Sequence, residues 1–271
     1  MSSGVRAALL LILGIAVAAA VIWWFSLRSP APAPAMPVAV APQPPASSAV
    51  AAPPAIQHPV EEAAGPLAAG QVDAALTGLL GRKAVASFLQ TTDFPRRFAA
   101  TVDNLGRSHA PVALWPVNPM GGRFTVQELP DGPVIGADNA ARYTPLVLLA
   151  EGTDTAQAAQ LYLRMYPLLQ RAYEELGYPK RYFNDRLVEV IDVLLATPEV
   201  DHPVKLRLVE VKGPIPSERP WVRYQYADPA LESLTAGQKI LVRAGPQNAR
   251  RLKAKLAQFR AQVAEGPAKR R

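Results

Sequence analysis

Three acids in the segment YFNDRLVEVIDVLLATPE have a spacing at which carboxylates could act together. Asp185, Glu189 and Asp192 are separated by four and then three residues. On a helix they share an arc of about 60°, and neighbours at this spacing have Cβ atoms about 5–6 Å apart. Paired carboxylates can divide the acid and nucleophile roles of glycoside hydrolysis. The spacing raises the hypothesis of a cell-wall hydrolase that uses Glu189 with Asp185 or Asp192.

The rest of the same helix favours a structural role for these acids. Apolar residues occupy most of its remaining circumference: Leu187, Val188, Val190, Ile191, Leu194 and Leu195. A helix with so wide an apolar face packs into a core and leaves its polar stripe outside. Asp185 also lies in the first turn, where a negative charge complements the helix dipole. The sequence leaves both a surface and a cleft open, and it favours the surface.

Other patterns that carry chemistry are missing from the sequence. The chain has no cysteine, which excludes disulfides, cysteine-ligated zinc, iron–sulfur clusters and thiol nucleophiles. Its three histidines, His58, His109 and His202, do not have the spacing of metal ligands. Phosphate-binding glycine loops and serine-nucleophile motifs are absent as well. We therefore expect no cofactor and no metal, and a binding protein is favoured over an enzyme.

A segment rich in proline and glycine, residues 106–140, is the first candidate for binding. It places Trp115, Met120 and Phe124 on predicted loops, and long loops are where binding residues concentrate. A tryptophan this large usually buries most of its area, so the alternative is that Trp115 fills the core. The sequence leaves both a binding role and a core role open for Trp115.

The second candidate is the basic side of the last predicted helix. Residues 238–271 hold ten of the basic residues and a single acid, Glu265, whereas the chain as a whole carries a net charge of +7. Arg250, Arg251 and Lys253 flank an apolar stripe. This helix could pack on the domain with its basic side in water, lie on an anionic lipid surface, or bind an acidic partner or polymer. Nucleic acid is not expected, because interleaved aromatic residues are lacking.

Hydrophobic periodicity predicts the elements that carry these residues. Helices are expected over 72–81, 82–90, 153–177, 184–196 and two segments within 228–265. Pro167 should kink or divide the third of them. Short strands are expected in RFTVQEL and in an alternating pair, VKLRLVEVK and WVRYQYA, that could form a hairpin. The predicted fold is mainly α with a minor β-hairpin or short strands (α+β).

The N-terminus is predicted to anchor the chain in a membrane. Ala7 to Leu27 is a run of 21 residues without charge. At about 1.5 Å per residue it spans about 31 Å, which matches the hydrocarbon core of a bilayer. The run is longer than the apolar part of a cleaved signal peptide. We expect residues 1–6 to stay cytoplasmic and the remainder to lie in the bacterial periplasm, as a single-pass inner-membrane protein.

A linker and one domain follow the predicted anchor. Residues 28–66 contain eleven prolines among alanine, serine and valine, a composition that disfavours helix and sheet. A mainly helical globular domain is expected over 67–264, and 265–271 form a basic tail. The expected partner is an envelope protein, an anionic polymer or a lipid surface.

Several segments resemble an uncharacterised bacterial family, domain of unknown function 3014. The matching stretches are RRFAATVDNL (96–105), WPVNPMGGRFTV (115–126), ARYTPLV (141–147), YPLLQRAYEELGYPKRYFNDRLVEVIDVLLATP (166–198) and ADPALESLTAGQKILVRAGPQNARRLKAKL (227–256). The resemblance implies a single anchored domain of bacterial envelope type. It assigns no catalytic or binding residue.

Overall fold

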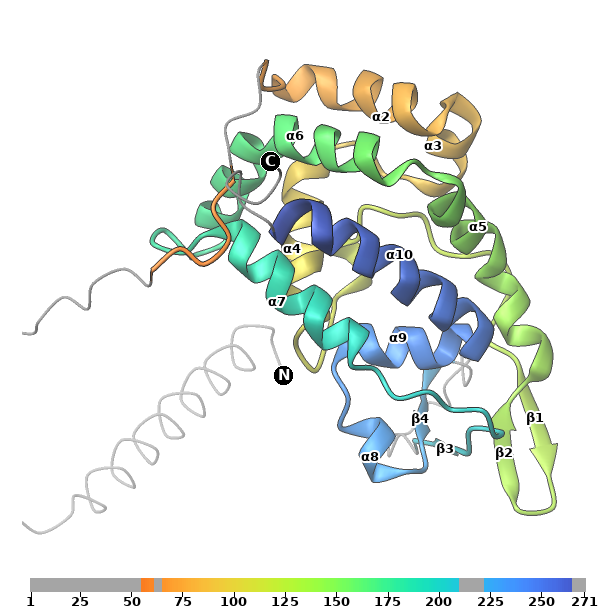
Figure 1. Ribbon diagram of the computed structural model, residues 1–271. Helices are drawn as coiled ribbons and strands as arrows, with labels where there is room; N and C mark the ends of the chain where they lie inside the picture. The colour runs from red at the N-terminus through yellow and green to blue at the C-terminus, as the bar shows by residue number, and fades with distance from the viewer. Residues whose placement is uncertain (1–54, 61–64, 210–221, 265–271) are drawn as a thin grey trace, which may run out of the picture. The chain divides into compact units, whose positions relative to one another are not determined.

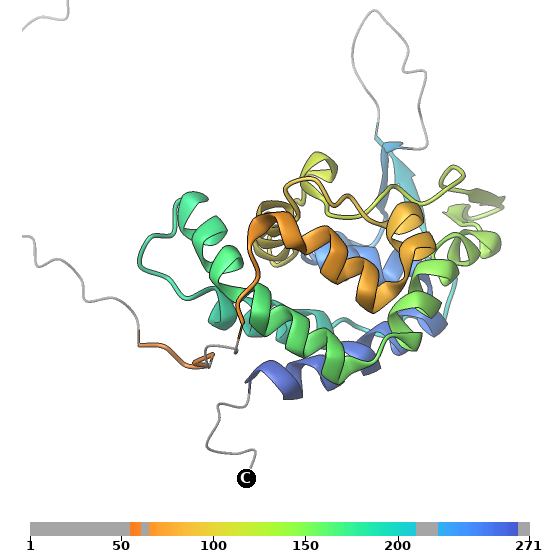
Figure 2. The same cartoon turned by 90° about the horizontal axis from the view of Figure 1, so that it is seen from above.

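Nine segments of the described chain form α-helices, and the four longest build the core (Figure 1). The computed structural model describes residues 55–60, 65–209 and 222–264. The central helices are α4 (Phe94–Leu105), α6 (Thr155–Glu175), α7 (Phe183–Leu195) and α10 (Pro246–Ala264). α4 packs on α6 and α7, and α10 packs across α6 and α7 from the other side. Figure 2 shows α6 and α10 side by side from above.

Smaller helices surround this centre. They are α2 (Val72–Leu80), α3 (Arg82–Phe88), α5 (Thr144–Gly152), α8 (Pro229–Glu232) and α9 (Ala236–Ala244), with 3-10 turns η1 (Ala69–Gln71), η2 (Val112–Leu114) and η3 (Ala137–Arg142). The helices expected over 72–81, 82–90 and 184–196 are confirmed as α2, α3 and α7, and the two expected within 228–265 contain α8 with α9 and then α10. α5 was not predicted, although Pro145 in its first turn is a usual start signal.

Pro167 lies inside α6, and of the two predicted effects, a kink or a division of the helix, the division is wrong. α6 runs without a break from Thr155 to Glu175, and its cap is Asp154, whose side chain accepts a hydrogen bond from the Gln157 amide. An interior proline removes one backbone hydrogen bond and strains the preceding turn. Buried Met165 and Leu169 lie on both sides of Pro167, so core packing holds the helix together across it.

Two small antiparallel hairpins complete the fold at one end of the helices (Figure 1). β1 (Val126–Leu129) pairs with β2 (Gly132–Ile135), and β3 (Leu206–Leu208) pairs with β4 (Tyr224–Tyr226). The second hairpin confirms the predicted pair of strands, with Leu206 opposite Tyr226. β2 was missed. Its signal was the Pro-Asp-Gly turn ending at Gly132, which has a φ of 110°.

The core is divided into two apolar clusters. The larger one lies between α4, α6, α7 and α10 and contains the fully buried Leu169 and Phe183. The smaller one lies under the hairpins and contains Tyr226, Leu231 and Val242. A backbone hydrogen bond from the Ile135 amide to the Val204 carbonyl joins the hairpins there. The fold is mainly helical with minor β structure, as the sequence predicts.

Four parts of the predicted organisation lie wholly or mostly outside the described residues: the N-terminus at 1–6, the membrane span at 7–27, the linker at 28–66 and the basic tail at 265–271. Within the described part of the chain, none of the helices combines the length and apolarity that crossing a membrane requires. The anchor and its orientation therefore stay predictions from the sequence.

Candidate binding site

The three acids of the predicted stripe lie on α7, and each has its own partner. The Asp185 carboxylate accepts hydrogen bonds from the backbone amides of Gln57 and His58, the shortest at 2.7 Å. These two residues lie within the segment predicted as linker. Asp185 thus holds a distant part of the chain.

The other two acids form ion pairs with arginines. Glu189 lies 3.0 Å from Nη1 of Arg186, one turn earlier on α7. Asp192 accepts a hydrogen bond of 2.9 Å from Nη2 of Arg260 on α10, and this bond raises the pKa of the Arg260 guanidinium. Two of the three acids therefore join α7 to other segments, Asp185 to residues 57–58 and Asp192 to α10, while Glu189 pairs within the helix.

The basic residues of α10 are engaged within the chain as well. Arg250 Nη1 lies 3.3 Å from Glu199 and 3.4 Å from Asp201, Arg251 lies 3.9 Å from Glu151, and Lys253 Nζ donates to the Thr197 carbonyl at 2.9 Å. The apolar stripe of this helix packs on the domain, as the first of the three interpretations predicts: Val263 is buried, and Leu252, Leu256 and Phe259 are partly buried.

Trp115 lies at the end of η2, on a loop that an arginine holds in place. Nη1 of Arg97 on α4 donates to the carbonyls of Ala113 and Trp115, at 2.8 and 3.3 Å. The Trp115 side chain is partly buried, so it does not fill the core. Its indole Nε1 is buried and has no hydrogen-bond partner among the described residues. A buried donor without an acceptor costs free energy, so this group calls for an explanation.

A pocket of about 450 Å³ opens beside Trp115, and we call it the Trp115 pocket. Its size falls within the range usual for small-ligand sites. The residues that line it are Val112, Trp115, Pro119, Met120, Gly122, Arg123, Phe124, Arg142, Tyr143, Val222, Tyr224, Ile240 and Arg243. These described lining residues include four aromatic rings and three arginines, and none is an acid. The pocket therefore combines flat apolar walls with positive charge.

Arg243 on α9 is the central cation of this pocket. Its guanidinium carbon lies 5.9 Å from the ring centre of Phe124 and 5.5 Å from that of Tyr226, both within range of a cation–π contact. Nη2 donates to the Tyr224 carbonyl at 3.4 Å, while Nε is buried and has no partner in the part of the chain that the structure describes. Burial raises the pKa of Tyr226, and the Arg243 charge acts in the opposite direction. The pocket thus contains a second buried donor that lacks an acceptor.

Arg142 shapes the rim of the pocket. Its Nε donates to the Gly121 carbonyl at 3.0 Å and its Nη1 to Asn139 Oδ1 at 2.9 Å. Asn139 is fully buried, and its Nδ2 donates to the Arg243 carbonyl at 3.1 Å. Gly122, next to this contact, has a φ of 75°, a conformation that favours glycine. These bonds connect the loop, η3 and α9, so the pocket walls belong to one network.

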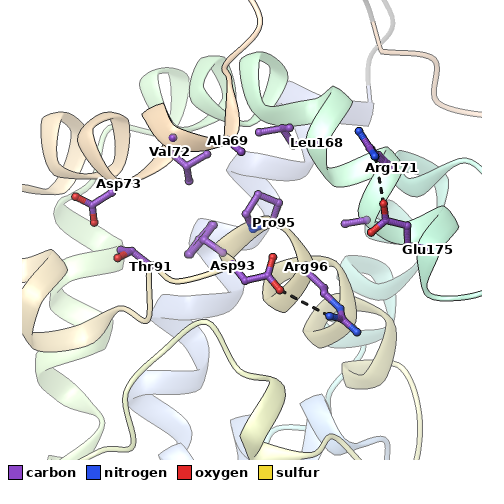
Figure 3. A pocket seen from close by; sticks show the side chains of 13 residues that line it. Ala69, Val72, Asp73, Thr91, Asp93, Pro95, Arg96, Leu168, Arg171 and Glu175 are labelled. Atoms are coloured by element: carbon purple, nitrogen blue, oxygen red, sulfur yellow. Dashed lines mark hydrogen bonds and ion pairs between the residues drawn. The ribbon is translucent and has the colours of Figure 1, made fainter.

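A second pocket lies between α2, α4 and α6 (Figure 3). Its charged side chains have both signs, and four of the five pair with a near neighbour in sequence: Arg171 with Glu175 at 3.1 Å, and Arg96 with Asp93 at 3.9 Å. All four of these side chains are more than half exposed to solvent. Asp93 has a positive φ of 54°, which aspartate tolerates better than most residues. A solvated and internally paired surface of this kind offers less to a ligand than the Trp115 pocket does.

The sequence placed Trp115, Met120 and Phe124 on the same stretch of loops, and all three line the pocket. It did not find Arg243 and Tyr224, which come from α9 and β4 and which only the fold brings to the same pocket. A nucleophile paired with a base is not found among the lining residues, and within the described residues no cluster of three histidines or acids could hold a metal. The arrangement is suited to binding.

Comparison with curated proteins and with solved structures gives no match. A family model described as protein of unknown function (DUF3014) matches residues 94–260, which is more than half of the chain. The matched range contains every residue that lines the Trp115 pocket. The chain therefore belongs to this family, as its resemblance predicted.

Proposed function

We propose that this protein is a non-enzymatic binding module of the bacterial envelope. In this proposal residues 7–27 anchor it in the inner membrane, residues 28–54 act as a spacer, and the helical domain holds a partner protein or an envelope polymer. The apolar run and the proline-rich composition support the location. Tethering raises the local concentration of the domain near the membrane, so a modest affinity would suffice.

The Trp115 pocket is the binding site in this proposal, and its ligand is an anionic segment that carries a ring or another flat apolar group. One observation supports this most: Trp115 Nε1 and Arg243 Nε are both buried without acceptors in the described structure, and both residues line a pocket that has arginines and no acid among its described lining residues. A carboxylate or phosphate oxygen that reached either donor would satisfy it, and bonds to a charged acceptor are stronger than neutral ones. The aromatic walls would pack against the apolar part of the ligand.

Crosslinking in the native cells tests this function. A photo-reactive amino acid is placed at Met120, which lines the pocket, and in a control at Leu148, an exposed residue of α5 that does not. We expect a specific adduct from Met120 and not from Leu148. The adduct should be lost in Trp115→Phe, which removes the indole N–H but keeps a ring, and in Arg243→Gln.

The nature of the adduct separates the two partner classes, because a protease degrades a protein partner and leaves a polymer. An adduct at Met120 that persists in both variants would contradict the proposed site. Equal labelling from Met120 and Leu148 would contradict a specific partner at this pocket.

A further inference from the structure

Residues 55–60 lie against the domain although their composition is that of the linker. We call this segment the strap. The amides of Gln57 and His58 donate to Asp185, and the Val60 amide donates to the Tyr182 hydroxyl at 2.7 Å. In Figure 1 the strap lies beside the start of α7.

Asn184 completes the contact from the domain side. Its Nδ2 donates to the carbonyl of His58 and to that of Val263 at the end of α10, both at 2.9 Å. The His58 ring adds a contact of 3.1 Å between Nδ1 and the Ala264 carbonyl. Nearly all of these bonds involve main-chain atoms of the strap, so the site recognises an extended main chain more than particular side chains.

The groups that hold the strap are fixed by the helical core. Asn184 is fully buried, and its Oδ1 accepts a hydrogen bond of 2.8 Å from Tyr162 on α6. Tyr182 packs its ring against Tyr166 at 5.4 Å between centroids. Asp185 lies in the first turn of α7, where the helix dipole stabilises a carboxylate. The site would therefore keep its geometry if the strap left it.

The strap itself adds little to the core. Val60 is the residue of the strap that packs against the large apolar cluster. Ile56 stays 55% exposed. A segment attached mainly by hydrogen bonds at the surface can open locally at a lower free energy than the global unfolding of the domain.

We propose that the start of α7 and the end of α10 form a binding site for extended main chain, that the strap is its occupant, and that the strap can leave while the helices stay folded. Among the described residues, the next attachment along the chain is Gly65, whose carbonyl accepts from Arg164 Nε at 3.1 Å. Release would lengthen the proposed spacer of residues 28–54 by about ten residues, or about 31 Å at the length of polyproline II. The site is thus a clip that sets the reach of the tethered domain.

Distance measurements on the full chain test the clip. The chain has no cysteine, so Ile56→Cys and the exposed Ala261→Cys on α10 accept a specific pair of spin labels. In detergent micelles the parent protein should give a single narrow distribution of short distances between the two spin labels. Asp185→Ala removes the acceptor of two strap amides, and we expect the released, long-distance fraction to rise at least tenfold. Tyr182→Phe, which removes the acceptor of Val60, should raise it less.

Glu189→Ala is the matched control, because Glu189 belongs to the same stripe but pairs with Arg186. It should leave the distance unchanged. Amide exchange within α6 should stay at the parent rate in all of these variants. Unchanged distances in both Asp185→Ala and Tyr182→Phe would overturn the assignment of the site. Faster exchange across the helices whenever the strap leaves would overturn its independent release.

Discussion

At the scale of single residues, Asp103 is a nearly buried carboxylate that is held by two arginines. It lies on α4 with a side chain only 9% exposed, and its Oδ1 accepts from Nε of Arg186 on α7 at 3.0 Å. Arg107 lies 2.9 Å from Oδ2, and the Tyr178 hydroxyl donates to the same atom at 3.2 Å. Asp103 therefore ties α4 to α7 and to the turn before it.

Asp103→Ala should lower the free energy of unfolding by about 3 kcal/mol, because Arg186 would lose its most buried partner. This value is the low end of the range of about 3–5 kcal/mol for removing one partner of a buried ion pair, because Arg186 would still form its ion pair with Glu189. Chemical denaturation of the purified protein measures the change. Glu175→Ala, which breaks an exposed pair with Arg171, should cost no more than about 0.5 kcal/mol. Equal effects of the two variants would show that Asp103 is not a structural charge.

The Glu232 carboxyl leads to a prediction of how the stability of the domain depends on pH. Burial alone would raise the pKa of its carboxyl, but hydrogen bonds from Lys239 and the Tyr226 amide, together with nearby positive charge, lower it overall. A group whose pKa is lower in the folded state contributes stability above its unfolded pKa and loses it as the pH falls through the folded pKa.

Glu232→Gln should therefore be destabilised by about 1–2 kcal/mol at pH 7 and by less at pH 3. The measurement is the free energy of unfolding of both proteins at a series of pH values between these limits. A difference that stays constant or grows towards acid would contradict the assignment of the Lys239 contact as the cause.

At the residue scale, some features of the candidate sites could be predicted from the sequence and others could not. The sequence located the acidic stripe on the polar side of α7, since apolar spacing fixes which face packs inward. It gave no sign that Asp185 binds main-chain amides 127 and 128 residues away, because the partners are not side chains. Likewise Arg250 and Lys253 were candidates for a partner, and their acceptors Glu199 and Thr197 lie in a distant segment.

At the scale of elements, α9 approaches α4 and α7 unusually closely at Gly237. A Cβ atom there would lie 2.5 Å from Leu194 Cδ2 and 3.1 Å from the Leu105 carbonyl oxygen. The Leu194 side chain could move, but the backbone oxygen could not. Gly237 therefore lets α9 pack at a distance that a larger residue would prevent.

Gly237→Ala should destabilise the domain by about 1–3 kcal/mol despite the higher helix propensity of alanine. Gly78→Ala is the control: Gly78 lies in α2, where an added Cβ would meet nothing within 4 Å. This variant should be stabilised by up to about 1 kcal/mol. The midpoint of thermal unfolding, relative to the parent protein, should thus fall in Gly237→Ala and rise in Gly78→Ala. A shift of both midpoints in the same direction would contradict the close approach of α9 at Gly237.

Elements with strong local signals were predictable and those fixed by long-range packing were not. α7 and α10 followed from wide apolar stripes, and the strands at Leu206 and Tyr226 followed from alternation. The continuous α6 did not follow, because the packing of Met165 and Leu169 overrides the local effect of Pro167. Trp115 was found by its size and its loop, whereas Arg243 and Tyr224 become its neighbours through tertiary structure.

At the scale of the whole molecule, the two proposed binding features belong to different parts of the chain. Residues of the loop before β1, of β4 and of α9 line the Trp115 pocket, whereas the clip lies at the start of α7. The pocket lies within the residues that the family model matches, and the strap lies before them. In our proposals, ligand binding therefore belongs to the family domain and control of reach to the segment that precedes it.

The direct test of ligand binding is the indole N–H signal of Trp115 in a labelled full chain, which Trp115→Phe identifies among the four tryptophans. The chain is titrated with N-acetylphenylalanine, a ring with a carboxylate, and separately with its uncharged amide. We predict that the carboxylate shifts this signal saturably and binds at least tenfold more tightly than the amide, about 1.4 kcal/mol. Arg243→Gln should abolish the difference, and Arg82→Gln on α3 should keep it. A Trp115 signal that neither compound moves, or that both move equally, would contradict the account.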